Sequence, residues 1–116
     1  MPNYINIGPS EYNIYNDNKV IHVINNVISE KYTASNLYKI EIVTFDNQDI
    51  LRDKLSLLQG KDFYIQRVSY RKIIESEDIV RVYELYKCNT FMYVCNINST
   101  QNNYVLTFYD CEKVLQ

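Results

Sequence analysis

The sequence lacks tryptophan and has little glycine, proline or alanine: two glycines, two prolines and a single alanine, Ala34, in 116 residues. Because Gly8 and Gly60 are its only glycines, a glycine-rich loop that would hold a nucleotide phosphate is excluded. The signature motifs of serine hydrolases, protein kinases, zinc proteases and EF-hands do not occur either. The sequence names no catalytic chemistry, and we predict no catalytic residue and no cofactor.

Histidine and cysteine are also scarce. The one histidine, His22, is distant along the chain from Cys88, Cys95 and Cys111, and no two of these cysteines form a CxxC pair. A structural zinc site uses about four such ligands at closer spacing, so we predict no metal site. We expect reduced thiols, because no cysteine has a sequence context that would activate it.

The charge balance is slightly acidic, with 12 basic and 14 acidic residues, a net charge of −2 and a pI near 5.3. These values exclude a generally basic nucleic-acid-binding domain but leave room for a local basic patch. The first 20 residues show neither the basic region nor the apolar run of a signal peptide, and no later run is long enough to span a membrane. We therefore expect a cytoplasmic protein, of the producing or host cell, without membrane contact.

Tyrosine, asparagine and isoleucine are abundant, with 12 tyrosines in the chain. These residues have AT-rich codons, which favours a gene from a virus, a phage or another mobile element, or from a low-GC organism. Hydrophobic residues make up 47% of the chain, and no repeat or low-complexity linker divides it. We therefore interpret 1–116 as one globular domain, with 1–18 as an extended arm or an edge strand.

One helix is predicted over 47–59. Leu51, Leu55 and Leu58 recur there at helical spacing, an aspartate precedes the first turn, and Gly60 fits the position after the last one. The apolar stripe should pack against a sheet.

Residues 19–31 fit two structures. Val20, Ile24, Val27 and Ile28 follow helical spacing, whereas the many β-branched residues favour a strand. A second helix over 19–31 is therefore left open.

Strands are predicted from alternation and from the turns between segments, at 37–45, 62–74, 78–86, 91–97 and 104–110. The last four form an antiparallel meander over 62–110, with one of its turns at Cys88-Asn89. The predicted fold is therefore α+β: an antiparallel sheet of about five strands with the helix at 47–59 on one face.

A three-residue turn at 75–77 sets the expected register, in which Tyr70 lies opposite Val82 and Arg71 lies opposite Arg81. Even-numbered residues of 62–74 then face the core. The outer face carries Arg67, Ser69, Arg71, Arg81, Tyr83, Leu85, Met92, Val94, Val105, Thr107 and Tyr109. Because like charges directly opposite each other destabilise a sheet, the Arg71–Arg81 pair indicates either a shifted register or a bound negative group.

The first candidate binding site on this face consists of Arg67, Ser69, Arg71, Arg81 and Tyr83. Two guanidiniums on a strand can clamp an anion, the serine can add a hydrogen bond, and the tyrosine can stack on a base. The ligand would be a nucleotide or RNA. The alternative is a solvated face whose arginines pair with nearby glutamates.

The second candidate site is an apolar contact surface made of Met92, Val94, Val105 and Tyr109. Such a surface suits another protein or a second copy of the chain, as in a homodimer. The alternative is that 19–31 covers these residues as a second helix.

The stretch RVSYRKIIESEDIVRVYEL, residues 67–85, resembles the basic hairpin of small RelE/ParE-type toxins. In those proteins, arginines and a tyrosine on strands engage RNA or a protein target, so the resemblance implies a small RNA-targeting nuclease. The chain departs from that pattern in its acidic pI and in having one short predicted helix, rather than two long ones, before the hairpin.

The leading hypothesis is a non-enzymatic interaction module, encoded by a virus or another mobile element, that binds a host or self protein through the outer sheet face. A binder of a nucleotide or RNA is the second hypothesis, and the nuclease is the third.

Overall fold

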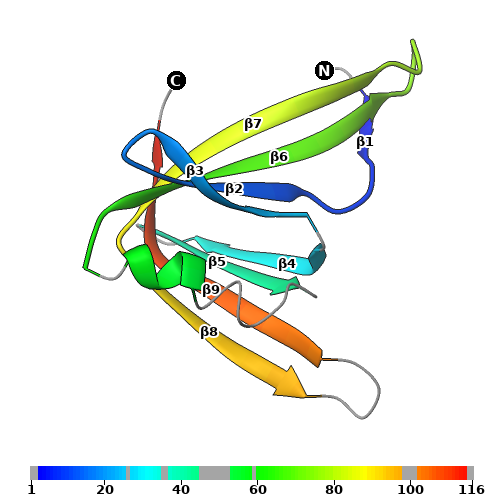
Figure 1. The fold of residues 1–116 in the computed structure, drawn as a ribbon. Helices are drawn as coiled ribbons and strands as arrows, with labels where there is room; N and C mark the ends of the chain where they lie inside the picture. The colour runs from blue at the N-terminus through cyan, green and yellow to red at the C-terminus, as the bar shows by residue number, and fades with distance from the viewer. Residues whose placement is uncertain are drawn as a thin grey trace.

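The computed structural model describes residues 3–25, 27–34, 37–44, 53–58, 60–97 and 102–114. In these residues the chain forms nine strands, all paired antiparallel, and a short helical segment at 53–58 that ends in the 3-10 turn η1 (Ser56–Leu58) (Figure 1). The strands are β1 (Tyr4–Asn6), β2 (Glu11–Asn16), β3 (Lys19–Ile24), β4 (Val27–Ala34), β5 (Tyr38–Thr44), β6 (Phe63–Ile73), β7 (Ile79–Cys88), β8 (Thr90–Ile97) and β9 (Asn102–Val114).

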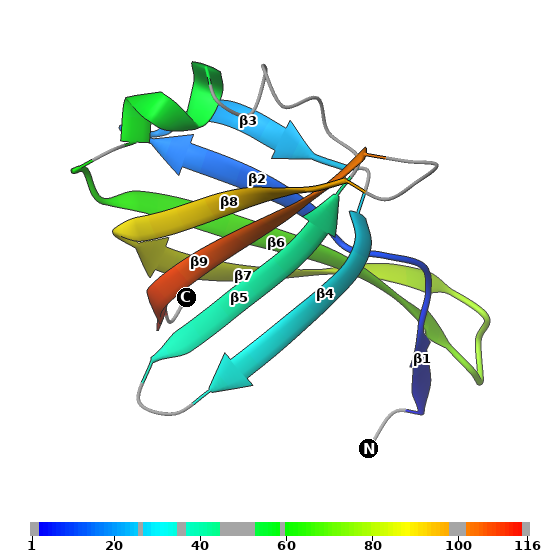
Figure 2. The same cartoon turned by 90° about the horizontal axis from the view of Figure 1, so that it is seen from below.

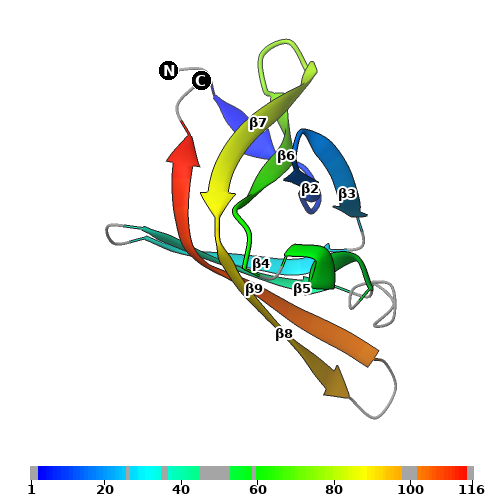
Figure 3. The ribbon, with the colours of Figure 1, turned by 60° about the vertical axis from the view of Figure 1, so that its left-hand side comes forward.

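The strands form two sheets that face each other across one core (Figures 1 and 3). Sheet A contains β3, β2, β6 and β7 in that order, with β1 beside the far end of β6. Sheet B contains β4, β5, β9 and β8. Each fully buried aliphatic or aromatic side chain contributes roughly 1.5–3 kcal/mol. The core includes Tyr12, Ile14, Ile24, Phe63 and Ile65 from sheet A, and Ile40, Ile42, Leu106 and Phe108 from sheet B.

Strand β9 carries the chain from one sheet to the other. Its first part pairs with β8 and β5 in sheet B, whereas 112–114 pair with β7 in sheet A. Asp110 has a φ of 54°, and the pairing of β9 with β5 shifts register between Tyr38 and Ile40. Such a β-bulge bends a strand, which allows β9 to serve both layers.

The predicted α+β fold with a packed helix and five strands is wrong, because the chain is nearly all antiparallel sheet and a second sheet, rather than a helix, covers the core. In the described part of the predicted helix, Leu55 and Leu58 are fully buried, as the leucine stripe predicted. The rest of that helix, at 47–52 and 59, lies outside the described residues. The predicted strand at 37–45 is confirmed as β5.

Residues 19–31 are extended, not helical. They supply β3 and the first part of β4, so the β-branched residues prevailed over the helical spacing. The two-residue turn Asp17-Asn18, with φ values of 52° and 64°, joins β2 to β3 in the geometry that suits a tight hairpin.

The predicted turn at Cys88-Asn89 is also wrong. Strand β7 leads into β8 through Asn89 alone, and both strands pair with β9 rather than with each other. The two strands therefore form one long arm of a hairpin whose other arm is β9.

The register of β6 with β7 differs by one residue from the prediction. Tyr70 lies opposite Arg81, and Val68 lies opposite Tyr83, because the turn contains four residues, 74–77, rather than three. The backbone N–H of Ile73 donates to the carbonyl of Asp78 across this turn. A shift of one residue turns every side chain of a strand to the other face, so the two faces of β6 are exchanged relative to the prediction.

Candidate functional site

An ionic cluster lies between the two sheets, centred on Arg67. The inward alternation of β6 that buries Phe63 and Ile65 places Arg67 on the same side. Its Nη2 and Nε donate to Glu30 Oε1 on β4 at 2.5 and 3.1 Å, and its Nη1 donates to Glu84 Oε1 on β7 at 2.7 Å. One guanidinium thus connects sheet B to sheet A, with 20% of its side chain exposed.

Tyrosines surround this cluster and complete its hydrogen bonds. The Tyr12 hydroxyl donates to Glu30 Oε2 at 2.9 Å and also lies within hydrogen-bonding distance of the Tyr32 hydroxyl. The Tyr32 ring lies 5.0 Å from the guanidinium carbon of Arg67, in cation–π contact. These contacts fix the position of Glu30 from several directions.

The charges in the cluster stabilise one another. Burial lowers the pKa of Arg67, but its hydrogen bonds with Glu30 and Glu84 and the nearby negative charge together outweigh this effect and raise the pKa. Burial raises the pKa of Glu84, but the hydrogen bond and charge of Arg67, with smaller contributions from Tyr86 and Lys113, together outweigh it, so the pKa of Glu84 lies below its usual value. Burial raises the pKa of Tyr12 and Tyr32. At neutral pH the tyrosines are therefore protonated, and the positive charge of Arg67 is balanced by the two glutamates. This arrangement suits a structural ion pair rather than an acid–base pair.

The five residues of the first predicted site do not share one surface. Arg67 and Ser69 face the inter-sheet side, where Ser69 is buried. Arg71 follows them and packs its guanidinium over the Tyr4 ring at 4.3 Å. Arg81 and Tyr83 lie on the opposite, outer face of sheet A. The register therefore separates Arg81 and Tyr83 from Arg67, Ser69 and Arg71.

Sequence reasoning missed a surface on the outer face of sheet A, which we call the tyrosine face. The strand registers bring its members side by side, with Tyr15 opposite Tyr64 and Tyr70 opposite Arg81. The alternation of the strands does indicate that these tyrosines share a face. The prediction placed Tyr64 and Tyr70 in the core instead, because the predicted turn was one residue too short. The tyrosine face consists of Tyr15, Tyr64, Gln66, Val68, Tyr70, Arg81, Tyr83 and Leu85.

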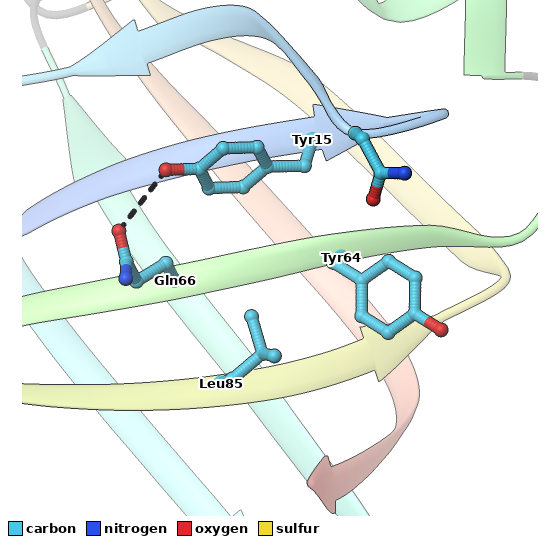
Figure 4. A pocket seen from close by; sticks show the side chains of 5 residues that line it. Tyr15, Tyr64, Gln66 and Leu85 are labelled. Carbon is cyan, nitrogen blue, oxygen red and sulfur yellow. Dashed lines mark hydrogen bonds between the residues drawn. The ribbon is translucent and has the colours of Figure 1, made fainter. Parts of the chain in front are cut away.

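A hollow of about 310 Å³ opens on the tyrosine face (Figure 4). It is lined by Tyr15, Asn18, Tyr64, Gln66 and Leu85. The Tyr15 hydroxyl and the Asn13 amide both donate to Gln66 Oε1, at 3.2 and 3.1 Å. Both bonds use the amide oxygen, so the orientation of the Gln66 amide is fixed without the use of its N–H groups. The lining of the hollow thus combines two aromatic rings, the apolar side chain of Leu85 and two amide side chains.

The residues of the second predicted site lie on the neighbouring strands β8 and β9. In sheet B, Val94 pairs with Val105, Met92 pairs with Thr107, and Tyr109 follows on the same side of β9. The Tyr109 ring has Lys39 Nζ 5.5 Å from its centre. Residues 19–31 do not cover this face as a helix, and in Figure 2 no other described strand lies in front of β4, β5, β8 and β9.

The described residues contain neither a metal-binding cluster nor a helix that could span a membrane. No group of three or more histidine, cysteine, aspartate or glutamate side chains is placed to hold a metal ion there. In the same part of the chain, no helix is long and apolar enough to cross a membrane.

Comparisons of the chain with models of protein families, with curated proteins and with solved structures gave no match.

Proposed function

We propose that the chain is a non-enzymatic interaction module that binds a protein partner, from a host or as a second copy, through the tyrosine face. The observation that carries this proposal is the gathering of tyrosines with one arginine and one leucine on a single exposed sheet surface. Tyrosine and arginine are enriched among the residues that dominate the energy of protein interfaces. Tyrosine also buries a large area while few side-chain torsions are ordered.

The geometry of the tyrosine face supports a protein ligand in two further ways. Arg81 and Tyr83 lie on the same face of β7, two residues apart, so a partner can contact the guanidinium and the ring together. The hollow beside Tyr64 can accept one apolar or aromatic side chain of a partner, with Leu85 among its lining residues.

The same geometry weakens the nucleotide and RNA hypothesis. Arg67 is neutralised by two glutamates between the sheets, and Arg71 packs on Tyr4. Arg81 is the one arginine of the predicted clamp that lies on the outer face, and one guanidinium gives little of the phosphate attraction on which such binding depends.

A photo-crosslinking amino acid at position 83 tests the proposal. Met92, on the outer face of sheet B, is the matched control position because its exposed fraction is 50% and that of Tyr83 is 48%. We expect a covalent adduct of defined mass in producing or host cells from position 83 and none from position 92. An adduct of twice the chain mass would identify a second copy as the partner.

Competition makes the result specific. Excess unlabelled wild-type protein should abolish the adduct, whereas an excess of a Tyr64→Ala, Arg81→Ala double variant should not, provided that its unfolding curve matches the wild type. An adduct from position 92 alone would move the contact to the outer face of sheet B, and no adduct from either position would contradict the proposal.

A further inference from the structure

Two cysteines stand opposite each other where β9 passes from sheet B to sheet A. The pairing of β9 with the long arm formed by β7 and β8 keeps one register on both sides of this point, with Lys87 opposite Glu112 and Thr90 opposite Tyr109. Counting inward from both pairs places Cys88 opposite Cys111. Their exposed fractions are 1% and 0%, so both side chains point into the core.

The spacing of such positions matches that of a disulfide. Residues directly opposite in antiparallel strands have Cα atoms about 4.5–5.5 Å apart, within the range of about 4.4–6.8 Å that disulfides span. Both cysteines belong to the same buried core cluster, where Cys111 Sγ lies 3.8 Å from the carbonyl oxygen of Tyr109. We propose that Cys88 and Cys111 are the two ends of an intramolecular disulfide that forms when the chain meets a disulfide oxidant.

The oxidant that the proposal requires is a low-molecular-weight disulfide such as oxidised glutathione. One cysteine thiolate attacks a glutathione sulfur, giving a mixed disulfide and one reduced glutathione. The second cysteine then attacks the protein sulfur of that mixed disulfide and releases a second reduced glutathione. Two protein thiols are oxidised, one glutathione disulfide is reduced, and the two thiol protons are balanced by the two glutathione thiols formed.

An oxidant can reach the buried cysteine pair of the folded chain only slowly, through one opening beside Cys88. Cys88 borders an open hollow of about 440 Å³ whose other lining residues are Leu37, Asp62, Lys87, Asn89, Asp110 and Glu112. Three of these are acidic and oppose both a thiolate and an anionic oxidant. The hydrogen bond from Cys111, followed by burial, also raises the pKa of the Cys88 thiol. We therefore expect faster oxidation during folding than in the folded protein.

The bond would join β7 to β9 at the strand crossing. Residue 88 belongs to sheet A and residue 111 lies beside the bulge at Asp110, where β9 changes sheets. A covalent link there prevents β9 from leaving sheet A while it remains in sheet B. It also restricts the unfolded chain, so the oxidised protein should unfold at a temperature about 10 °C higher than the reduced protein.

Alkylation followed by intact mass measurement tests the proposal. The fully reduced chain should take up three maleimide groups under denaturing conditions, one for each of its three cysteines. After refolding with oxidised glutathione it should take up one. Chymotryptic cleavage after Phe91 and Tyr104 separates the cysteines, and the peptide that carries Cys88 should be joined to the peptide that carries Cys111.

Variants give the matched comparison. Cys95→Ala should keep the link and the rise in unfolding temperature, whereas Cys88→Ala and Cys111→Ala should abolish both. The wild-type peptide map decides the result even if a core variant does not fold. Uptake of three maleimides after oxidative refolding, or a link that involves Cys95, would overturn the proposal.

Discussion

At the scale of single residues, Arg67 links the two sheets through its guanidinium. A cation this far inside a β-sandwich is tolerated because Glu30 and Glu84 accept its hydrogen bonds from two different strands. Moving two charges out of water costs several kcal/mol, and the ion pair offsets that loss only while all its partners are present. The cluster is therefore sensitive to any one-sided change.

Arg67→Met should lower the free energy of unfolding by about 3–5 kcal/mol, because it removes the cation that Glu30 and Glu84 share and leaves Glu84 with only the more exposed Lys113. Urea unfolding at neutral pH measures this change. Arg81→Met, on the exposed outer face of the same sheet, is the control and should stay within about 0.5 kcal/mol of the wild type. Equal effects of the two substitutions would mean that Arg67 has no special role.

Glu84→Gln should change how stability depends on pH. The pKa of Glu84 is lower in the folded chain than its unfolded value of about 4.3, so its stabilisation is complete above that value and is lost as the pH falls through the folded-state pKa. The variant should therefore be less stable than the wild type at pH values of about 5–7, with a difference that shrinks below about pH 4. Urea unfolding at a series of pH values tests this, and a difference that stayed constant down to about pH 2 would rule out the assignment.

The sequence could predict that Arg67 lies on a strand but not which way it points. Its partners are distant in the chain, with Glu30 37 residues and Glu84 17 residues away. An arginine that alternates with apolar residues is ordinarily placed on the solvent side, and the predicted turn of three residues agreed with that placement. Long-range pairing with Glu30, which no local pattern reveals, makes the inward position favourable.

At the scale of elements, the strands were easier to predict than their partners. Alternation located β5, β6, β7, β8 and the middle of β9, because period-two patterning is a local property. Two errors at turns, at Cys88-Asn89 and at 75–77, gave the wrong neighbours and the wrong faces. Met92 and Val105 lie on adjacent strands, as the alternation predicted, because β8 and β9 are consecutive in the chain and pair antiparallel.

The turn between β6 and β7 can be tested through Glu77, which has a φ of 60°. This left-handed conformation favours glycine, so the sequence carries no obvious sign of it. Glu77→Gly should be neutral or stabilise by up to about 1 kcal/mol, and Glu77→Val should destabilise by about 1–2 kcal/mol. Thermal unfolding of both variants measures the change, and the reverse order would argue for a different turn.

At the scale of the whole molecule, β9 makes the two sheets one cooperative unit. Pairings such as Tyr38 with Cys111 connect distant parts of the chain, and sandwiches of this kind fold slowly because the chain must close long loops first. Neither sheet retains its full set of strands if β9 leaves. The two layers should therefore form and unfold together.

We expect refolding in milliseconds to seconds and a single unfolding transition. The chain has 12 tyrosines and no tryptophan, so tyrosine fluorescence and circular dichroism provide two independent probes. The urea midpoints from the two probes should coincide. Two separated transitions would instead indicate that sheets A and B fold as independent units.

The cluster around Arg67 also has a consequence for evolution. Since loss of Arg67 removes the cation shared by both glutamates, and loss of either glutamate removes an ion pair of Arg67, substitutions at positions 30, 67 and 84 are tolerated together more readily than one at a time. Among descendants of this sequence, the three positions should therefore covary, either conserved as an ionic triad or replaced jointly by apolar residues. Selection would act on the group of three as a single heritable trait.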